Sequence, residues 1–379
     1  MQFKKIKLKD IADINMGQSP SGSSYNNNGR GIPFLQGNKT FGFLYPTIDT
    51  WTTEHKKIGK KNSVLMSVRA PVGDLNIANK DICIGRGLCS IEMKNGNNQY
   101  LYYLLKNSIK KIKMKSTGTV FDSINRKELE NIEILDFNKS QQKKISKVLF
   151  DIDKKIELNI QTNDNLLELI NDLYKESFRN IEGYKQADEI ANITIGKTPP
   201  RSNRECFTYN EDDIKWLSIS DLGKCGMYAW NTSEKLTEDS VNKYNVKVIP
   251  ENTIVLSFKL TIGRIAITAN KMATNEAIAH FNLLDNDMIY YLYFYLKNFD
   301  YSKLGNTSSI ATAVNSKIIK AMPIGIPNKH SVLEFNNTVR PLFEKIKLNE
   351  EQNVTLTQLR DNLLPKLMNG EIDLDKIEI

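Results

Sequence analysis

The chain has 379 residues, 40% of them hydrophobic and 25% charged, which is the mix of a globular protein with two or three domains. It holds no run of 18 apolar residues, and its charged start has no apolar segment behind it, so neither a membrane span nor a signal peptide is expected. A net charge of +8 favours a polyanionic partner, although lysine enrichment alone would give the same excess.

Three segments occur twice along the chain. Residues 11–20 (IADINMGQSP) return at 190–199 (IANITIGKTP), and residues 64–73 (VLMSVRAPVG) return at 254–263 (IVLSFKLTIG). The tract TGTVFDSINRK at 117–127 is similar to TSSIATAVNSK at 307–317, which places Asn125 over Asn315. The last two segments return after 190 residues and the first after 179, so the second copy holds about eleven extra residues. This spacing predicts two similar domains, not a solenoid of short repeats.

Each copy mixes strands and helices. Short apolar runs at 63–67 and 253–257 are typical of strands and are followed by glycine-containing turns. Residues 99–113 have helical composition, as do residues 288–298 in the second copy. The fold class expected is therefore α+β, with two similar α/β domains.

Both copies end in a long helix whose apolar residues recur at alternating steps of four and three, which is the spacing of a coiled-coil seam. Two consecutive seam positions are asparagine in each copy, as expected where buried amides fix helix register. A helix that packs only on its own domain remains an alternative for either copy. The predicted helix-pairing residues are Ile145, Leu149, Ile152, Ile156, Asn159, Asn163, Leu166, Val339, Leu342, Ile346, Asn349, Asn353 and Leu356.

The order of segments predicts how the helices pair. We expect domains at 1–139 and 181–329, a first spacer helix at 140–180, and a second helix with the C-terminal tail at 330–379. Antiparallel pairing would give a pseudo-two-fold arrangement, with a spacer of about 38 residues, roughly 57 Å long. Arg360, Pro341 and Pro365 interrupt the second seam, and Pro341 predicts a kink.

Catalytic and cofactor motifs are weak. The run Gly196-Lys197-Thr198 resembles the end of a phosphate-binding loop, but Ala191 stands where the first glycine belongs and two prolines follow. The four cysteines form no Cys-x-x-Cys pair and the three histidines are scattered, which leaves little material for a zinc site. The low cysteine count favours a reducing cytoplasm. We therefore predict no catalytic residues, metal site or cofactor in this chain.

Polar and basic residues in loops form a candidate DNA surface, because cations grip phosphates while polar side chains read base edges. Arg69 over Lys259 is a cation retained after a strand, and Gly73 and Gly263 beside them allow close backbone approach. Arg86 aligns with Glu276, so the two copies should read different bases. A solvated lysine face is the alternative for the basic cluster around residues 106–115. The candidates are Gln36, Asn38, Lys39, Arg69, Arg86, Lys111, Lys113, Lys115, Thr117, Thr119, Ser218, Ser220, Lys259, Arg264, Asn275, Thr307 and Ser309.

Taken in this duplicated order, the opening motif, the strand–glycine segments, the tract from Thr117 and the long helices resemble the DNA specificity subunit of type I restriction–modification systems. The chain departs from that family in its first joint, where residues 136–142 (DFNKSQQ) lack the proline kept at Pro327. The resemblance implies a bipartite, asymmetric double-stranded DNA target. It also implies two methyltransferase subunits and restriction–translocase subunits as partners, which would carry S-adenosylmethionine and ATP with Mg²⁺.

Two other classes remain open from the sequence. One is a self-contained endonuclease with an unrecognised carboxylate site, and the other is a coiled-coil scaffold that binds DNA without sequence preference. Magnesium-dependent cleavage by the purified chain would favour the first, and equal affinity for specific and random duplex would favour the second.

Overall fold

The computed structural model describes residues 4–115, 123–304 and 314–374. The chain folds into two compact units: unit 1 holds residues 1–158 and 355–379, and unit 2 holds residues 159–354. Each long helix is therefore shared, since both units include part of α4 (Lys139–Ser177) and part of α10 (Lys329–Met368). In the described part of the chain, no helix is both long and apolar enough to cross a membrane.

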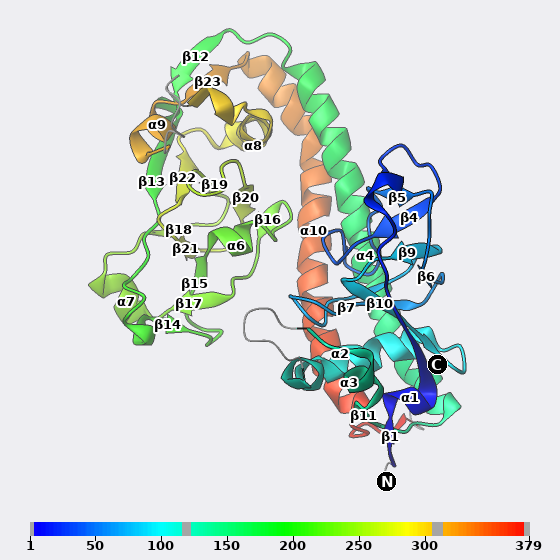
Figure 1. The fold of residues 1–379 in the computed structure, drawn as a ribbon. Helices are drawn as coiled ribbons and strands as arrows, with labels where there is room; N and C mark the ends of the chain where they lie inside the picture. Colours follow the sequence, from blue (N-terminus) through cyan, green and yellow to red (C-terminus); the bar gives the residue numbers. More distant parts are fainter. Residues whose placement is uncertain (1–3, 116–122, 305–313, 375–379) are drawn as a thin grey trace. The chain divides into compact units, whose positions relative to one another are not determined.

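Unit 1 contains two main sheets and one strand pair (Figure 1). The first sheet has the order β2 (Ala12–Met16), β10 (Leu88–Met93), β7 (Val64–Ser67), β8 (Leu75–Ile77). The second has the order β3 (Tyr25–Asn26), β5 (Trp51–Thr52), β4 (Ile32–Leu35), β9 (Ile82–Ile84), β6 (Ile58–Gly59). The pair joins β1 (Lys5–Lys7) to β11 (Glu133–Leu135).

Unit 2 repeats this topology with one added strand, β16, at the edge of its first sheet. Its first sheet has the order β13 (Ala191–Ile195), β22 (Ile278–Leu283), β19 (Ile254–Ser257), β20 (Ile265–Thr268), β16 (Tyr228–Ala229). Its second has the order β14 (Phe207–Thr208), β17 (Glu234–Leu236), β15 (Ile214–Leu217), β21 (Met272–Thr274), β18 (Val248–Ile249), and its strand pair joins β12 (Gly183–Gln186) to β23 (Pro323–Ile326). Even the register is kept: Leu88 pairs with Ser67, and Ile278 pairs with Ser257. The duplication seen in the sequence is thus a duplication of sheet topology.

The predicted local elements are confirmed. The apolar runs form β7 and β19, and the two helical segments form α2 (Asn98–Lys115) and α8 (Ile289–Asn298). The remaining short α-helices are α1 (Leu8–Ile11), α3 (Arg126–Glu130), α5 (Ala187–Ile190), α6 (Ile219–Leu222), α7 (Glu238–Lys243) and α9 (Ser316–Lys320). Single 3-10 turns occur at Gly22–Ser24, Arg204–Cys206, Asn286–Met288 and Tyr301–Leu304.

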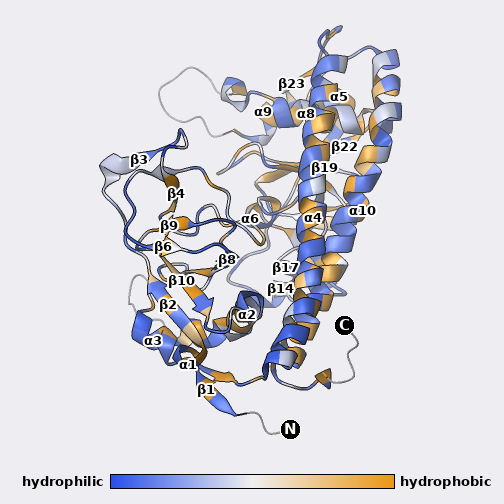
Figure 2. Cartoon of the chain, turned by 90° about the vertical axis from the view of Figure 1, so that its right-hand side faces the viewer, coloured by the Kyte–Doolittle hydropathy of each residue, from blue (hydrophilic) through white to orange (hydrophobic). Residues whose placement is uncertain are grey.

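The long helices contribute directly to both hydrophobic cores. In unit 1, Ile145 and Leu149 of α4 belong to the same buried cluster as Leu364 and Leu367 of α10. In unit 2, Ile170 of α4 is buried in one cluster with Val339 and other residues of α10. Figure 2 shows apolar and polar residues mixed along both helices, as expected for helices with one buried stripe.

The asparagines of the predicted seam meet across the two helices within unit 2. Asn159 Nδ2 donates to Asn353 Oδ1 at 2.8 Å and to Gln352 Oε1 at 2.9 Å. Asn349 Nδ2 donates to Asn163 Oδ1 at 2.8 Å, and Asn163 Nδ2 donates in turn to the Ile346 carbonyl at 3.3 Å. Asn159, Asn163 and Asn349 are buried, and the amides satisfy one another across the helices, so they favour one alignment of the two helices.

The prolines of α10 do not end the helix. It runs without interruption from Lys329 to Met368 through Pro341 and Pro365. Both proline side chains are exposed, on the side away from the core. The helix is continuous through Pro341, and the kink expected there stays a prediction.

A buried ionic network stands at the point where Arg360 interrupts the seam. Within unit 1, Arg360 Nη1 donates to Asp153 Oδ1 at 2.7 Å, and the Tyr103 hydroxyl donates to Asp153 Oδ2 at 2.8 Å. Lys106 Nζ lies 3.8 Å from the same carboxylate, and burial lowers its pKa. Burial also disfavours the Arg360 cation, but Asp153 and Asp361 together outweigh burial and raise the Arg360 pKa. The network ties α4, α10 and α2 together.

Candidate nucleic-acid interface

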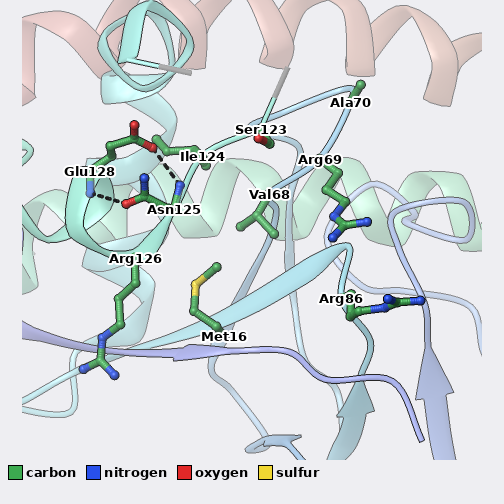
Figure 3. Close-up of a pocket in the computed structure, with 10 residues that line it drawn as sticks. All are labelled: Met16, Val68, Arg69, Ala70, Arg86, Ser123, Ile124, Asn125, Arg126 and Glu128. Carbon is green, nitrogen blue, oxygen red and sulfur yellow. Dashed lines mark hydrogen bonds between the residues drawn. The ribbon is translucent and has the colours of Figure 1, made fainter. Parts of the chain in front are cut away.

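A basic hollow of about 610 Å³ opens on unit 1 (Figure 3). Arg69 and Arg86 lie near one another at one side of it, and Arg126 lies at the other. Arg126 is engaged by Glu130 at 2.7 Å, whereas among the described residues neither Arg69 nor Arg86 has an ion-pair partner. All three side chains are exposed. Exposed guanidinium groups on a concave surface suit phosphate oxygens. The full lining is Met16, Val68, Arg69, Ala70, Arg86, Ser123, Ile124, Asn125, Arg126 and Glu128.

The loop that carries Arg69 is held from inside by Ser67, the last residue of β7. The Ser67 hydroxyl donates to the Pro71 carbonyl at 2.6 Å and accepts from the Asp74 N–H at 2.8 Å. The Gly73 N–H donates to the Ser67 carbonyl at 3.0 Å, and Gly73 has a φ of +95°. We call this arrangement the serine tether. It fixes both ends of the turn, so that the loop presents Arg69 on a rigid frame.

The loop of unit 2 has the same tether. Ser257 Oγ donates to the Thr261 carbonyl and accepts from the Arg264 N–H at 3.0 Å. The Gly263 N–H donates to the Ser257 carbonyl at 3.0 Å, and Gly263 has a φ of +92°. The cation on this frame is Lys259, which is exposed. Both units thus present one strand-anchored cation, as the alignment of Arg69 with Lys259 predicts.

The glycines of these loops face their own unit. A Cβ on Gly73 would lie 3.3 Å from Ile109 of α2, and one on Gly263 would lie 3.2 Å from the Tyr301 ring. We expected these glycines to let the backbone approach a partner. Instead, they let the backbone pack closely against side chains of the same unit.

A second segment supports the hollow beside Arg69. Backbone atoms of Arg69 form an isolated bridge with Ser123, and the Ile124 N–H donates to the Val68 carbonyl at 3.1 Å. Asn125 then caps α3, because its side chain accepts from the Glu128 N–H at 3.0 Å. Asn315 caps α9 in the same way. The aligned asparagines are thus helix caps.

Arg86 is tied to the neighbouring candidate Gln36. The Arg86 N–H donates to Ser19 Oγ at 3.2 Å, and Ser19 Oγ donates to Gln36 Oε1 at 2.8 Å. A Cβ on Gly85 would lie 2.8 Å from the Gln36 Cα, so the glycine next to Arg86 lets the two backbones pack. Arg86, Gln36 and the Arg69 loop therefore belong to one end of unit 1, although the hollow itself does not include Gln36.

Other candidates are engaged inside the fold. Asn38 Nδ2 donates to Asp74 at 2.6 Å, and Ser218 caps α6 by accepting from the Asp221 N–H at 3.0 Å. Arg264 Nη1 donates to the Ile219 carbonyl at 2.7 Å, and Asn275 Oδ1 accepts from the Ala277 N–H at 3.1 Å. These contacts give each side chain a structural role, and their contact with DNA stays a prediction.

The remaining candidates are exposed or lie outside the described residues. Exposed side chains are those of Lys39, Ser220, Lys111, Lys113 and Lys115. Thr117, Thr119, Thr307 and Ser309 lie outside the described residues. Glu276, aligned with Arg86, is exposed and accepts a hydrogen bond from Thr198.

The helix-pairing candidates lie on the inner side of both long helices. Ile145, Leu149, Ile156, Asn159, Asn163, Val339, Ile346 and Asn349 are buried, and Ile152, Leu166, Leu342, Asn353 and Leu356 are partly buried. The seam pattern did not identify buried Asp153, which lies beside Ile152.

Sequence reasoning also missed the tether serines and one carboxylate. Ser67 and Ser257 stand at the same place in both copies of the strand–glycine segment, which was the available signal. Glu350 of α10 accepts from the Met227 and Tyr228 N–H groups at 2.7 and 3.0 Å and from Trp230 Nε1 at 3.1 Å. Burial raises its pKa to about 7 against these three donors.

Three features of the described residues bear on a possible metal or nucleotide site. Among them, no group of three or more His, Cys, Asp or Glu side chains could hold a metal ion. The run at Gly196 follows β13 and leads into a loop without a helix, where Lys197 N–H donates to the Thr274 carbonyl at 2.9 Å. Buried His280 is held between Thr194 and Thr274, and burial lowers its pKa to about 4, as for a core residue.

Duplicated sheets that each present a strand-anchored cation are the arrangement expected of a protein that binds a polyanion through two related modules. Comparison with known proteins is consistent with this class. The type I restriction modification DNA specificity domain matches the chain twice, over residues 2–168 and 182–358.

Relatives and solved structures agree with the family match. The chain is 27% identical to the type I restriction enzyme MjaIX specificity subunit of Methanocaldococcus jannaschii, over 98% of this chain and 94% of that protein. It is 31% identical to the HindI specificity subunit of Haemophilus influenzae over 50% of this chain and 41% of the relative. Another M. jannaschii relative is 42% identical over 180 residues, which cover only 42% of that protein.

The fold is similar to the crystal structure of a type I restriction–modification S subunit from M. genitalium, with a TM-score of 0.58, 17% identity and coverage of 97% and 96% of the two chains. The chain belongs to the type I restriction–modification DNA specificity family. Its role is that of a DNA specificity subunit, as the resemblance in its sequence predicted.

Proposed function

We propose that this chain reads a bipartite, asymmetric sequence in double-stranded DNA, one part with each unit. The observation that carries the proposal is the serine tether, which presents Arg69 in unit 1 and Lys259 in unit 2 on the same frame. The frame is shared while the residues around it differ, so the two units have the same way of gripping phosphate and different ways of reading bases.

The long helices have a separate role in this proposal. As an antiparallel coiled-coil pair they would hold the two target-recognition domains in pseudo-two-fold relation, at a fixed separation. The amide contacts between Asn159 and Asn353 and between Asn163 and Asn349 support a single helix register. A fixed register would give the DNA target a fixed gap between its two parts.

Catalysis belongs to partner subunits in the same proposal. Two methyltransferase subunits would dock on the helices and supply S-adenosylmethionine, and restriction–translocase subunits would supply ATP and Mg²⁺. The chain itself would be the non-catalytic, cytoplasmic subunit that brings those enzymes to their target.

Co-expression with a methyltransferase partner tests the proposal. Adenine methylation of the host genome would be mapped by long-read sequencing. We expect one split motif with two unequal parts and a constant gap. A stable complex that methylates no motif, or an unsplit motif, would refute it.

The two competing classes are tested with the purified chain. Cleavage of plasmid DNA on addition of Mg²⁺ would establish a self-contained endonuclease. Equal affinity for the mapped motif and for random duplex, measured at the same salt concentration, would establish a scaffold without sequence preference.

A further inference from the structure

Leu260 has a backbone conformation and a solvent exposure that are both unfavourable for leucine. It follows Lys259 in the tethered loop of unit 2 and has a φ of +61°, in the left-handed region that branched, bulky residues rarely adopt. Its side chain is 96% exposed, the highest value among the large exposed hydrophobic residues of the described chain. Neither the backbone preference of leucine nor the burial of apolar surface explains this residue at this place.

Hydrogen bonds of the loop impose the conformation. The Thr261 N–H donates to the Lys259 carbonyl at 2.7 Å, which closes a three-residue turn centred on Leu260. The carbonyl of Thr261 is in turn bound by the Ser257 hydroxyl of the tether. Leu260 is thus held outward by its neighbours on both sides, and such local strain clusters at ligand-binding sites.

The chemistry around Leu260 indicates what it meets. Lys259 beside it is an exposed cation, and Ile262 two residues on is 39% exposed. The loop therefore offers a positive charge for phosphate and an apolar tip next to it. On the edges of base pairs in the major groove, the apolar group is the 5-methyl of thymine.

We propose that Leu260 is a specificity-determining residue that packs on a thymine methyl in the part of the target read by unit 2. This inference rests on the proposed function and names the base-pair class that one loop selects. The corresponding position in unit 1 is Ala70, which is exposed and follows Arg69. Its single methyl group gives that loop a shorter reach, so the two loops would differ in the bases they accept.

Glycine at position 260 separates this role from a structural one. Glycine adopts positive φ without steric cost, and Leu260 buries little surface, so L260G should leave the unfolding temperature of the complex unchanged or higher. In cells, the L260G complex should methylate a motif in which one A·T position, in one part only, has become degenerate. The matched control is L284A, which removes another exposed leucine of unit 2, 71% exposed and outside the loop. It should keep the parent motif.

Uracil substitution then tests the contact itself. Duplexes carrying the mapped motif would have each thymine replaced in turn by deoxyuridine, which lacks only the methyl group. At one position we expect wild-type affinity to fall about fourfold, the effect of one buried methyl, and L260G to bind both duplexes equally.

The outcomes separate the two proposals. No methylated motif with the wild-type complex would refute the proposed function. A split motif that L260G leaves unchanged, a part without any A·T pair, or a uracil effect that persists in L260G would overturn the role of Leu260.

Discussion

The ionic network of unit 1 makes a quantitative prediction about stability. Arg360→Met keeps most of the side-chain volume but removes the guanidinium that pairs with Asp153 at 2.7 Å. The Asp153 side chain is 0% exposed and that of Arg360 only 7% exposed, so the remaining carboxylate cannot turn to water. Removal of one partner from a buried ion pair costs about 3–5 kcal/mol. We expect Arg360→Met to lower the free energy of unfolding of unit 1 by that amount.

The double variant Asp153→Leu/Arg360→Met should behave differently. It removes the charges of Asp153 and Arg360, and the buried hydrophobic pair would recover part of the lost stability. About 1–3 kcal/mol should remain lost, because the Tyr103 hydroxyl loses its acceptor and the Lys106 ammonium loses its carboxylate partner. Unit 2 supports this expectation. The positions 190 residues away from Asp153 and Arg360 are Phe343 and Ile170, and both are buried in its apolar core.

Hydrogen exchange measured by mass spectrometry is the appropriate assay, because the two units need not unfold together. In Arg360→Met, protection of α2 and β10 should fall by about two to three and a half orders of magnitude, while β19 and β22 of unit 2 serve as the internal reference. Lys147→Met is the control, since its pair with Asp151 is 54% and 66% exposed and should contribute less than about 1 kcal/mol. A change of less than tenfold in Arg360→Met would refute the reasoning.

Three further predictions concern the helices and the interface. The double variant Asn159→Leu/Asn353→Leu removes both partners of one amide hydrogen bond, so thermal stability should rise while the helix register loosens. A single species in native mass spectrometry would count against a role of this amide pair in fixing the register. Burial raises the pKa of Glu350 to about 7 from an ordinary 4.5, so the folded state holds the proton more tightly, and stability should fall by about 3 kcal/mol as pH rises from about 4.5 to 7. E350Q should flatten this dependence in denaturant titrations of unit 2, and an unchanged pH profile would contradict it. Arg69→Ala and Lys259→Ala should each make the dependence of log K on log salt concentration less steep by about 0.9. The corresponding loss of affinity at about 0.1 M salt is roughly eightfold. An unchanged slope in either variant would mean that the residue does not contact phosphate.

Periodicity and repetition in the sequence were enough to predict most of the fold. The 190-residue repeat predicted the strands β7 and β19, and the four–three spacing predicted the buried amides of Asn159 and Asn163. These features depend on which residues are apolar and how often they recur, and a sequence displays both directly.

The details of the interface depend on contacts that spacing does not report. Asn38 and Ser218 have the polar side chains of base-reading residues, yet each is engaged by a neighbour in the fold. The left-handed backbone of Leu260 follows from the hydrogen bonds of its loop, against its own preference. Asp153 was missed because a buried charge is identified by its partner, here Arg360, 207 residues away.

The division of the chain into units also sets the order in which it can fold during synthesis. Unit 2 is continuous, from residue 159 to 354, whereas the core of unit 1 includes Leu364, Leu367, Met368 and Leu374. The ribosome therefore releases everything that unit 2 needs before unit 1 can close its core. Until the last turns of α10 emerge, the buried cluster that contains Ile145 and Leu149 lacks its C-terminal members, so unit 1 exposes apolar surface for longer than unit 2 does.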